Sequence, residues 1–237
     1  MTATLAILAG GRGTRLGPLL CDLPKPMLPV AGRPFLEYLV EWAGRFGIDD
    51  IVLCVGFRAE KIRAHFGNGG GRIRYSAERE PLGTAGALRL ALPLVRTDPF
   101  LAMNGDSFCP VELDALLRKH RDRRAAATLA VVETEDRSRF GSVEVGTGGD
   151  VLGFREKGAG AGRGWINGGV YALGKNVLER VAEGSSASIE RDVFPGLVGR
   201  GLCAFGTPGP LVDIGTPESL EAAHGVVPGL LRRRSGP

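Results

Sequence analysis

The first half of the chain alternates short apolar runs with stretches in which apolar residues recur at helical spacing. The apolar runs have the character of buried parallel strands, and parallel strands are usually joined by crossover helices. We therefore predict an α/β fold with a mainly parallel, Rossmann-like sheet flanked by helices. The predicted strands are 4–10, 51–57, 73–78 and 100–106, and the predicted helices are 32–47, 59–67, 84–95 (interrupted by Pro93) and 111–124.

The second half contains apolar runs with shorter connections, which predicts an added mixed or antiparallel region. We expect strands at 127–133, 141–145, 151–156, 167–173, 203–207 and 211–215, helices near 175–182 and 189–200, and a last helix opened by Thr216 and Pro217. No linker and no internal repeat interrupts the pattern. The prediction is one domain over 1–228, with halves 1–110 and 111–228, followed by a flexible tail over 229–237.

The charge and the cysteines exclude several classes of protein. The net charge is +4, but Arg232 to Arg234 lie in a terminal RRRSGP, which leaves +1 for the rest of the chain. No basic stripe carries interleaved aromatics, and no apolar run approaches the ~20 residues that span a membrane. The four cysteines are scattered without a CxxC pair. We expect a reduced cytoplasmic protein with no nucleic-acid or membrane partner.

A glycine-rich segment, LAGGRGTRLGPLLCDLPKPMLPV over 8–30, follows the first predicted strand. In an open parallel sheet, ligands bind beyond the carboxyl ends of the strands. Glycines at 10, 11 and 13 allow a sharp turn that aims backbone N–H groups at an anion. Positive charge is supplied by Arg12, Arg15 and Lys25. The segment therefore predicts a phosphate-binding loop, and the alternative is an ordinary glycine turn with surface arginines.

Two common phosphate motifs are absent. A P-loop needs Gly-Lys-Ser/Thr, which does not occur in the chain. The dinucleotide pattern GxGxxG fails because Leu16 stands where the third glycine belongs, which disfavours a dinucleotide-dependent oxidoreductase.

Several motifs together resemble the sugar-1-phosphate nucleotidylyltransferase family. GGRGTRL and LPKPMLPV match its signature, and EREPLGTAGAL, LAMNGD, RFGSVEV, FREKG, INGGV and DIGTPE follow in the expected order over nearly the whole chain. The resemblance implies a GT-A-like fold in which 1–110 binds nucleotide and 111–228 binds sugar phosphate, with a homodimer as a guess. It also implies transfer of a nucleoside monophosphate from a nucleoside triphosphate to a sugar 1-phosphate, with release of pyrophosphate and without a covalent nucleophile.

The same resemblance assigns the catalytic groups. Asp106 and Asp213, each at the end of a predicted strand, would hold Mg²⁺, which typically takes one or two carboxylates together with substrate phosphates. A lone aspartate at such a place more often stabilises a turn or caps a helix. Arg15 would hold the leaving pyrophosphate, and Lys25 the α-phosphate.

The remaining site residues fall into two groups. The nucleotide group is Leu8, Gly10, Gly11, Gly13, Thr14, Arg15, Glu78, Gly83 and Thr84. The sugar-phosphate group is Gly141, Glu156, Lys157, Asn167, Gly168 and Gly169. The chain departs from the family at Gly158, where proline is usual, and at Leu211 and Val212, where relatives often carry an aromatic residue.

Glu78 favours GTP as the donor nucleotide. A carboxylate offers only acceptors, which match guanine N1–H and N2–H₂, whereas the glutamine of uridylyl-transferring relatives suits uracil. Glu78 could equally be a surface residue at a strand end.

The sequences of these motifs are most similar to those of the D-glycero-α-D-manno-heptose 1-phosphate guanylyltransferases. Mannose 1-phosphate guanylyltransferases, many of which carry a further C-terminal domain, and uridylyl- or thymidylyltransferases are the alternatives. A transferase with a choline-phosphate or other non-sugar acceptor also stays open, and a non-catalytic paralogue that senses a sugar nucleotide is the alternative of another class.

Overall fold

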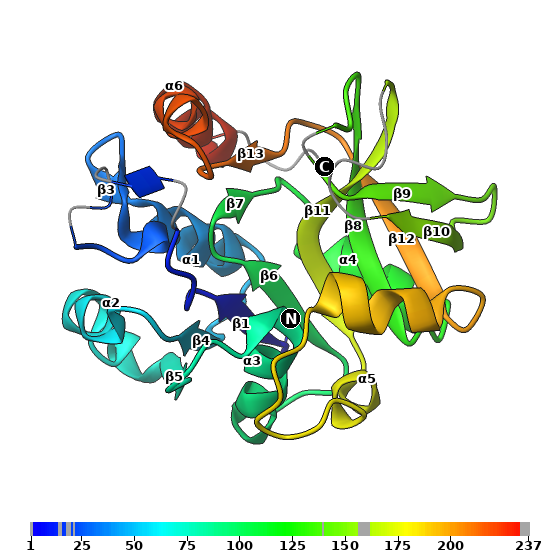
Figure 1. Cartoon of the computed structure of the whole chain (residues 1–237), viewed down its shortest axis with the longest axis horizontal. Coiled ribbons are helices and arrows are strands. Elements are labelled where there is room, and N and C mark those ends of the chain that lie inside the picture. The colour runs from blue at the N-terminus through cyan, green and yellow to red at the C-terminus, as the bar shows by residue number, and fades with distance from the viewer. Residues whose placement is uncertain are drawn as a thin grey trace.

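A nine-stranded sheet forms the centre of the molecule in the computed structural model (Figure 1). The structure describes residues 2–13, 16–17, 20, 22–138, 140–155 and 162–232. Seven strands follow the order β10-β9-β11-β6-β1-β4-β5, while β8 pairs with β11 and β12 pairs with β8. The sheet continues without a break from the first half of the chain into the second.

The parallel part comes from the first half of the chain, as predicted. It consists of β6 (Phe100–Asn104), β1 (Thr4–Leu8), β4 (Asp50–Val55) and β5 (Ile73–Ala77). These four strands are adjacent and all parallel, and β1 lies between β6 and β4. Burial on both faces explains why these segments read as almost continuous apolar runs.

The antiparallel part is attached through β11 (Gly164–Leu173), which pairs with β6. The other strands are β8 (Ala127–Thr134), β9 (Ser142–Val145), β10 (Val151–Arg155) and β12 (Leu202–Thr207). Among the described strand pairs of this region, only β12 and β8 run parallel. The predicted mixed extension is confirmed.

Helices cover both faces of the sheet, because side chains of successive strand residues point to opposite faces. Leu5 and Ile7 enter one apolar core, and Ala6 between them enters the other. The first core packs against α1 (Phe35–Arg45), α2 (Ala59–Phe66), α4 (Leu113–Asp122) and α6 (Pro217–Arg232). The second packs against α3 (Gly83–Ala91) and α5 (Lys175–Glu179).

Short elements complete the fold. Two small ladders are formed by β2 (Pro29–Val30) with β3 (Arg33–Pro34) and by β7 (Ser107–Phe108) with β13 (Val212–Asp213). Short 3₁₀ turns include η2 (Lys25–Met27), η3 (Gly69–Gly71) and η4 (Leu92–Leu94). Pro93 lies in η4, so the third helix ends at Ala91, close to where the sequence placed its interruption.

Two predicted boundaries are wrong. The single helix expected over 189–200 is a π turn, η5 (Ile189–Val193), followed by a 3₁₀ turn, η6 (Phe194–Leu197), because Pro195 lacks the N–H that a continuous helix needs. The tail expected from residue 229 begins inside α6, where Leu230 and Leu231 are buried. Residues 233–237 lie outside the described part. No helix among the described residues combines the length and apolarity needed to cross a membrane.

Candidate nucleotide-binding site

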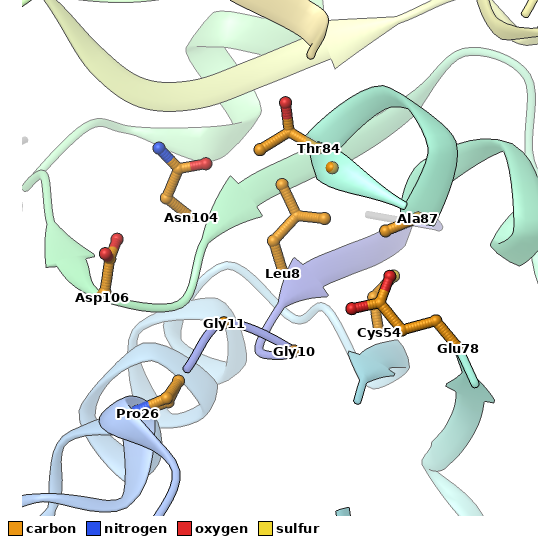
Figure 2. A pocket seen from close by; sticks show the side chains of 11 residues that line it. Leu8, Gly10, Gly11, Pro26, Cys54, Glu78, Thr84, Ala87, Asn104 and Asp106 are labelled. Carbon is orange, nitrogen blue, oxygen red and sulfur yellow. The ribbon is translucent and has the colours of Figure 1, made fainter. Parts of the chain in front are cut away.

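A pocket of about 240 Å³ opens at the carboxyl ends of β1, β4 and β6 (Figure 2). Parallel strands end at one edge of a sheet, which is where α/β folds bind ligands. Figure 2 shows Glu78 at one end of the pocket and Asp106 at the other. The lining residues are Leu8, Gly10, Gly11, Pro26, Cys54, Glu78, Gly83, Thr84, Ala87, Asn104 and Asp106.

Lys25 reaches the Asp106 end of the pocket. Its Nζ donates a hydrogen bond to Asp106 Oδ2 over 2.6 Å, and its side chain is only 12% exposed. The backbone of the glycine loop passes close to the stem of this lysine. Gly13 has φ +65°, and a Cβ at that position would lie 2.9 Å from Lys25 Cβ. The loop therefore needs glycine at position 13, because a side chain there would collide with the side chain of Lys25.

Asp213 is brought beside Asp106 by the β7–β13 ladder. It pairs with Ser107 in that ladder, and the next amide, Ile214 N, donates to Asp106 O over 3.0 Å. Asp213 Oδ1 accepts from Gly215 N at 2.7 Å and from Ser219 Oγ at 2.9 Å. The carboxylate thus stabilises the turn into α6, which is the structural role that the sequence left open, while the ladder holds the backbone of this turn against Asp106.

Glu78 is half-buried at the opposite end. Its Oε2 accepts from Leu82 N at 3.1 Å, and a Cβ on Gly10 would lie 2.6 Å from its Oε1. Burial raises the pKa of Glu78, and the Leu82 amide offsets part of this rise. The adjacent Cys54 is fully buried, and desolvation, helped by the charge of Glu78, raises the pKa of its thiol to about 12. Cys54 is therefore an inert wall of the pocket.

Three of the predicted sugar residues, Asn167, Gly168 and Gly169, lie on β11, outside the pocket lining, where the pairing of β11 with β8 shifts register. Asn167 N donates to Gly141 O over 2.9 Å, and Gly169 N donates to Asn167 Oδ1 over 3.0 Å. A Cβ on Gly169 would lie 2.8 Å from Asn104 Nδ2, so residues 167–169 pack directly on the pocket wall. This irregular segment of β11 is called the sugar turn below. Gly168 faces the buried Cys109.

The chain matches the model of one protein family over residues 5–227, which is described as nucleotidyl transferase. The chain belongs to the nucleotidyl transferase family.

Similar nucleotidyl transferases include enzymes named for two sugars. A D-glycero-α-D-manno-heptose 1-phosphate guanylyltransferase of Aneurinibacillus thermoaerophilus is 34% identical over 221 residues, which are 92% of this chain and 95% of that protein. A mannose-1-phosphate guanylyltransferase of Mycobacterium tuberculosis is 36% identical over 233 residues, which are 94% of this chain and 65% of that protein. The chain thus spans just under two thirds of the latter's length.

A solved structure has the same fold as this nucleotidyl transferase. The crystal structure of HddC from Yersinia pseudotuberculosis complexed with GMP-PN is 31% identical to this chain and superposes with a TM-score of 0.82. The match covers 94% of this chain and 98% of that chain.

Nucleotidyl transferases generally use a divalent metal ion, and the residues present fit one. The described residues hold no group of three or more His, Cys, Asp or Glu side chains that could form an all-protein metal site. Asp106 instead lines the pocket, and Asp213 lies on the neighbouring strand of the β7–β13 ladder, so two carboxylates are available. This donor set suits a hard cation that keeps waters and phosphate oxygens among its ligands.

The structure brings together seven of the predicted site residues on the pocket lining: Leu8, Gly10, Gly11, Glu78, Gly83, Thr84 and Asp106. Gly13, Lys25, Asp213, Gly141, Asn167, Gly168 and Gly169 lie around it, and Thr14, Arg15, Glu156 and Lys157 fall outside the described residues. Sequence reasoning missed Pro26, Cys54, Ala87 and Asn104. Pro26 and Asn104 adjoin predicted residues in the PKP and NGD motifs, whereas Cys54 and Ala87 look like ordinary core positions.

Proposed function

We propose that this chain transfers GMP from GTP to a sugar 1-phosphate, with D-glycero-α-D-manno-heptose 1-phosphate as the first candidate acceptor. The products are the GDP-sugar and pyrophosphate. The observation that carries the proposal is the pocket itself, which has an acceptor carboxylate at one end and the Lys25–Asp106 pair at the other. These two ends suit the two ends of a nucleoside triphosphate, because the carboxylate can accept from the base and the lysine can donate to the charged phosphate chain.

The chemistry is an in-line displacement at the α-phosphorus. A phosphate oxygen of the sugar 1-phosphate forms the new P–O bond as the bond to the β-phosphate oxygen breaks, and the pyrophosphate leaves with that electron pair. Both reactants are anions, so the protein's task is to position them and to neutralise charge. We assign the triphosphate to the backbone N–H groups of residues 10–13 and the α-phosphate to Lys25. Arg15 keeps its predicted role at the pyrophosphate.

We propose that the metal ion is Mg²⁺, held by Asp106 and Asp213 together with phosphate oxygens. When bound, it supplies electrophilic charge at the reacting phosphates. In the protein described here, the Lys25 ammonium donates to Asp106. The ammonium has three N–H donors, so Lys25 can donate to the substrate phosphate while it keeps its hydrogen bond to Asp106.

The acceptor is proposed from relatives and from the composition of the adjoining turn. Asn167, Gly168 and Gly169 present a segment without bulky side chains, and Gly169 lies against Asn104 and Ser107. Glu156 and Lys157 keep their predicted contacts with sugar hydroxyls and sugar phosphate. Mannose 1-phosphate is the second candidate, favoured by the 36% identity to a mannose-1-phosphate guanylyltransferase. Both candidates share the reaction and differ in the sugar.

We also propose a cytoplasmic location, because Cys54, Cys109 and Cys203 are buried free thiols. A homodimer remains part of the proposal and is tested by light scattering.

The first experiment measures pyrophosphate release with Mg²⁺, pairing GTP, UTP, dTTP, CTP and ATP with the 1-phosphates of heptose, mannose and glucose. Selective turnover of GTP with the heptose phosphate is the expected result. Turnover with mannose 1-phosphate alone keeps the reaction and replaces the acceptor. No turnover in any pair, with the protein folded and still binding nucleotide, would leave the sensing paralogue as the function.

A further inference from the structure

Glu190 connects the two sides of the candidate site. It lies in the π turn η5, far in sequence from either group of predicted residues. Its Oε2 accepts from Thr84 Oγ1 at 2.8 Å, on the nucleotide side. Its Oε1 accepts from the Tyr171 hydroxyl at 3.2 Å, on the strand that carries the sugar turn. A third hydroxyl, Ser188 Oγ, also donates to Oε2 over 2.8 Å.

The direction of each hydrogen bond follows from the carboxylate, which can only accept. Tyr171 must donate its single proton to Glu190, so its oxygen is left to accept from Asn167 Nδ2 at 2.9 Å. Asn167 Oδ1 is then turned toward Gly169 N, from which it accepts at 3.0 Å. The Glu190 carboxylate therefore determines which group donates and which accepts in each hydrogen bond from Tyr171 to the backbone of the sugar turn.

The same rule holds on the nucleotide side. Thr84 donates to Glu190, and its oxygen accepts from Ile189 N at 2.8 Å. Thr84 stands in the first turn of α3, directly after Gly83, whose φ of +69° places it against Ala187 O. Both the start of α3 and the η5 turn are thereby held to one carboxylate.

Tyr171 is suited to pass this orientation on. Its ring is fully buried and packs edge-on against Phe194 at 5.2 Å between ring centroids. Burial, with a further contribution from the charge of Glu190, raises the pKa of Tyr171 well above its usual range, so the hydroxyl keeps its proton. The side chain of Asn104, which lines the pocket, offsets part of this rise in the pKa of Tyr171.

We propose that Glu190 is a positioning residue that fixes the nucleotide-binding start of α3 and the sugar-binding turn 167–169 relative to each other. The proposal rests on the function given above and adds a residue that the motifs did not indicate. Nucleotide and sugar phosphate react only when their phosphates are aligned, and a small misplacement of one reactant lowers the rate much more than its binding.

Glu190→Gln tests this with the least change in shape. An amide turns one of the two acceptor oxygens into a donor. Either the Tyr171 hydroxyl or the hydroxyls of Thr84 and Ser188 must then accept from residue 190 instead of donating to it. We expect kcat to fall about 10- to 100-fold, while KM values and the dissociation constant of GTP alone change less than about threefold. Tyr171→Phe should do the same, and the double variant should be no worse than either single one, because both break one chain of contacts.

Asp192→Asn is the matched control. Asp192 lies in the same turn, but its Oδ2 accepts from the backbone of Ser188 and touches neither Thr84 nor Tyr171. We expect this control to keep kcat within about twofold of the unmodified chain. Unchanged kcat in Glu190→Gln, or an equal loss in the control, would overturn the proposal. So would a loss of kcat that follows a fall in melting temperature and in GTP affinity.

A second readout separates this inference from the proposed function. GTP binding is expected to slow amide exchange at Gly169 in the unmodified chain and in Asp192→Asn, but not in Glu190→Gln. This measurement needs no turnover, so it tests the coupling even if every acceptor fails. Absence of the effect in the unmodified chain would refute the coupling and leave the transferase proposal standing.

Discussion

Glu78 combines two properties that bear on the choice of nucleotide. Its carboxylate lines the pocket between Gly10 and Cys54, and one oxygen already accepts from Leu82 N. The other oxygen faces the glycine loop. The ionised carboxylate offers guanine only acceptors, whereas protonation would turn one oxygen into a donor, and burial works against ionisation.

Exchanging this carboxylate for an amide should relax nucleotide selectivity. We expect Glu78→Gln to lower kcat/KM for GTP about 10- to 100-fold, since a buried hydrogen bond to a charged group contributes ~1.5–3 kcal/mol. The kcat/KM for UTP should stay the same or rise, because an amide can match uracil. Steady-state kinetics with both nucleotides decide the matter. An equal loss for both would show that Glu78 supports the fold of the pocket and does not read the base.

The raised pKa of Glu78 also predicts a pH-dependent difference in stability. Below the ordinary value of 4.5 the carboxyl is protonated in both folded and unfolded chains and makes no difference. As the pH rises through the interval between that value and the raised folded pKa, ionisation favours the unfolded chain. Glu78→Gln should therefore gain stability relative to the unmodified chain above this interval and lose the gain below it. Urea unfolding at pH 4 and pH 7.5 measures the two differences, and a gain independent of pH would contradict the assignment.

At the level of elements, the left-handed backbone of the glycine loop at Gly13 leaves space for the Lys25 side chain. Gly13→Ala would place a methyl 2.9 Å from Lys25 Cβ at a φ of +65°. We expect a loss of ~1–2 kcal/mol in unfolding free energy from the left-handed backbone alone, and a larger fall in turnover because Lys25 is displaced. Gly44→Ala is the control, since it lies within α1 with open space around it and should gain ~0.5–1 kcal/mol. Equal effects of the two substitutions on stability would show that the loop tolerates a side chain.

The elements also show how far the sequence could predict this molecule. The strands of the parallel sheet follow from apolar runs, and the loop after β1 follows from its glycines and charges. Glu190 could not be found in this way, because its partner Thr84 is 106 residues away and the turn between them has no regular period. The helix predicted near 189–200 is wrong for a local reason, because Pro195 interrupts it. Local patterns reveal elements, whereas contacts between distant loops appear only after the sheet has assembled.

At the scale of the whole molecule, the two halves of the chain share one sheet. β6 of the first half and β11 of the second pair at Val170–Met103, Tyr171–Ala102, Ala172–Leu101 and Leu173–Phe100. Separating the halves would expose this apolar strand edge, and the Trp42 indole, which donates to Val111 O across the boundary over 3.0 Å, would lose its partner. We therefore expect the halves to unfold together, as the prediction of one domain over 1–228 requires.

The chain carries one tryptophan in each half, so this expectation can be measured directly. Trp42 lies in α1 and Trp165 in β11. In Trp165→Phe the fluorescence reports the first half, and in Trp42→Phe it reports the second. We expect the fluorescence midpoint in urea to coincide with the far-UV circular dichroism midpoint within each variant, because a two-state transition gives every probe the same midpoint. Trp42→Phe should have the lower midpoint, since it leaves Val111 O without its donor, and it should still show a single transition. Separated midpoints in either variant would mean that 1–110 and 111–228 unfold as independent units and that the contacts between β6 and β11 do not couple them.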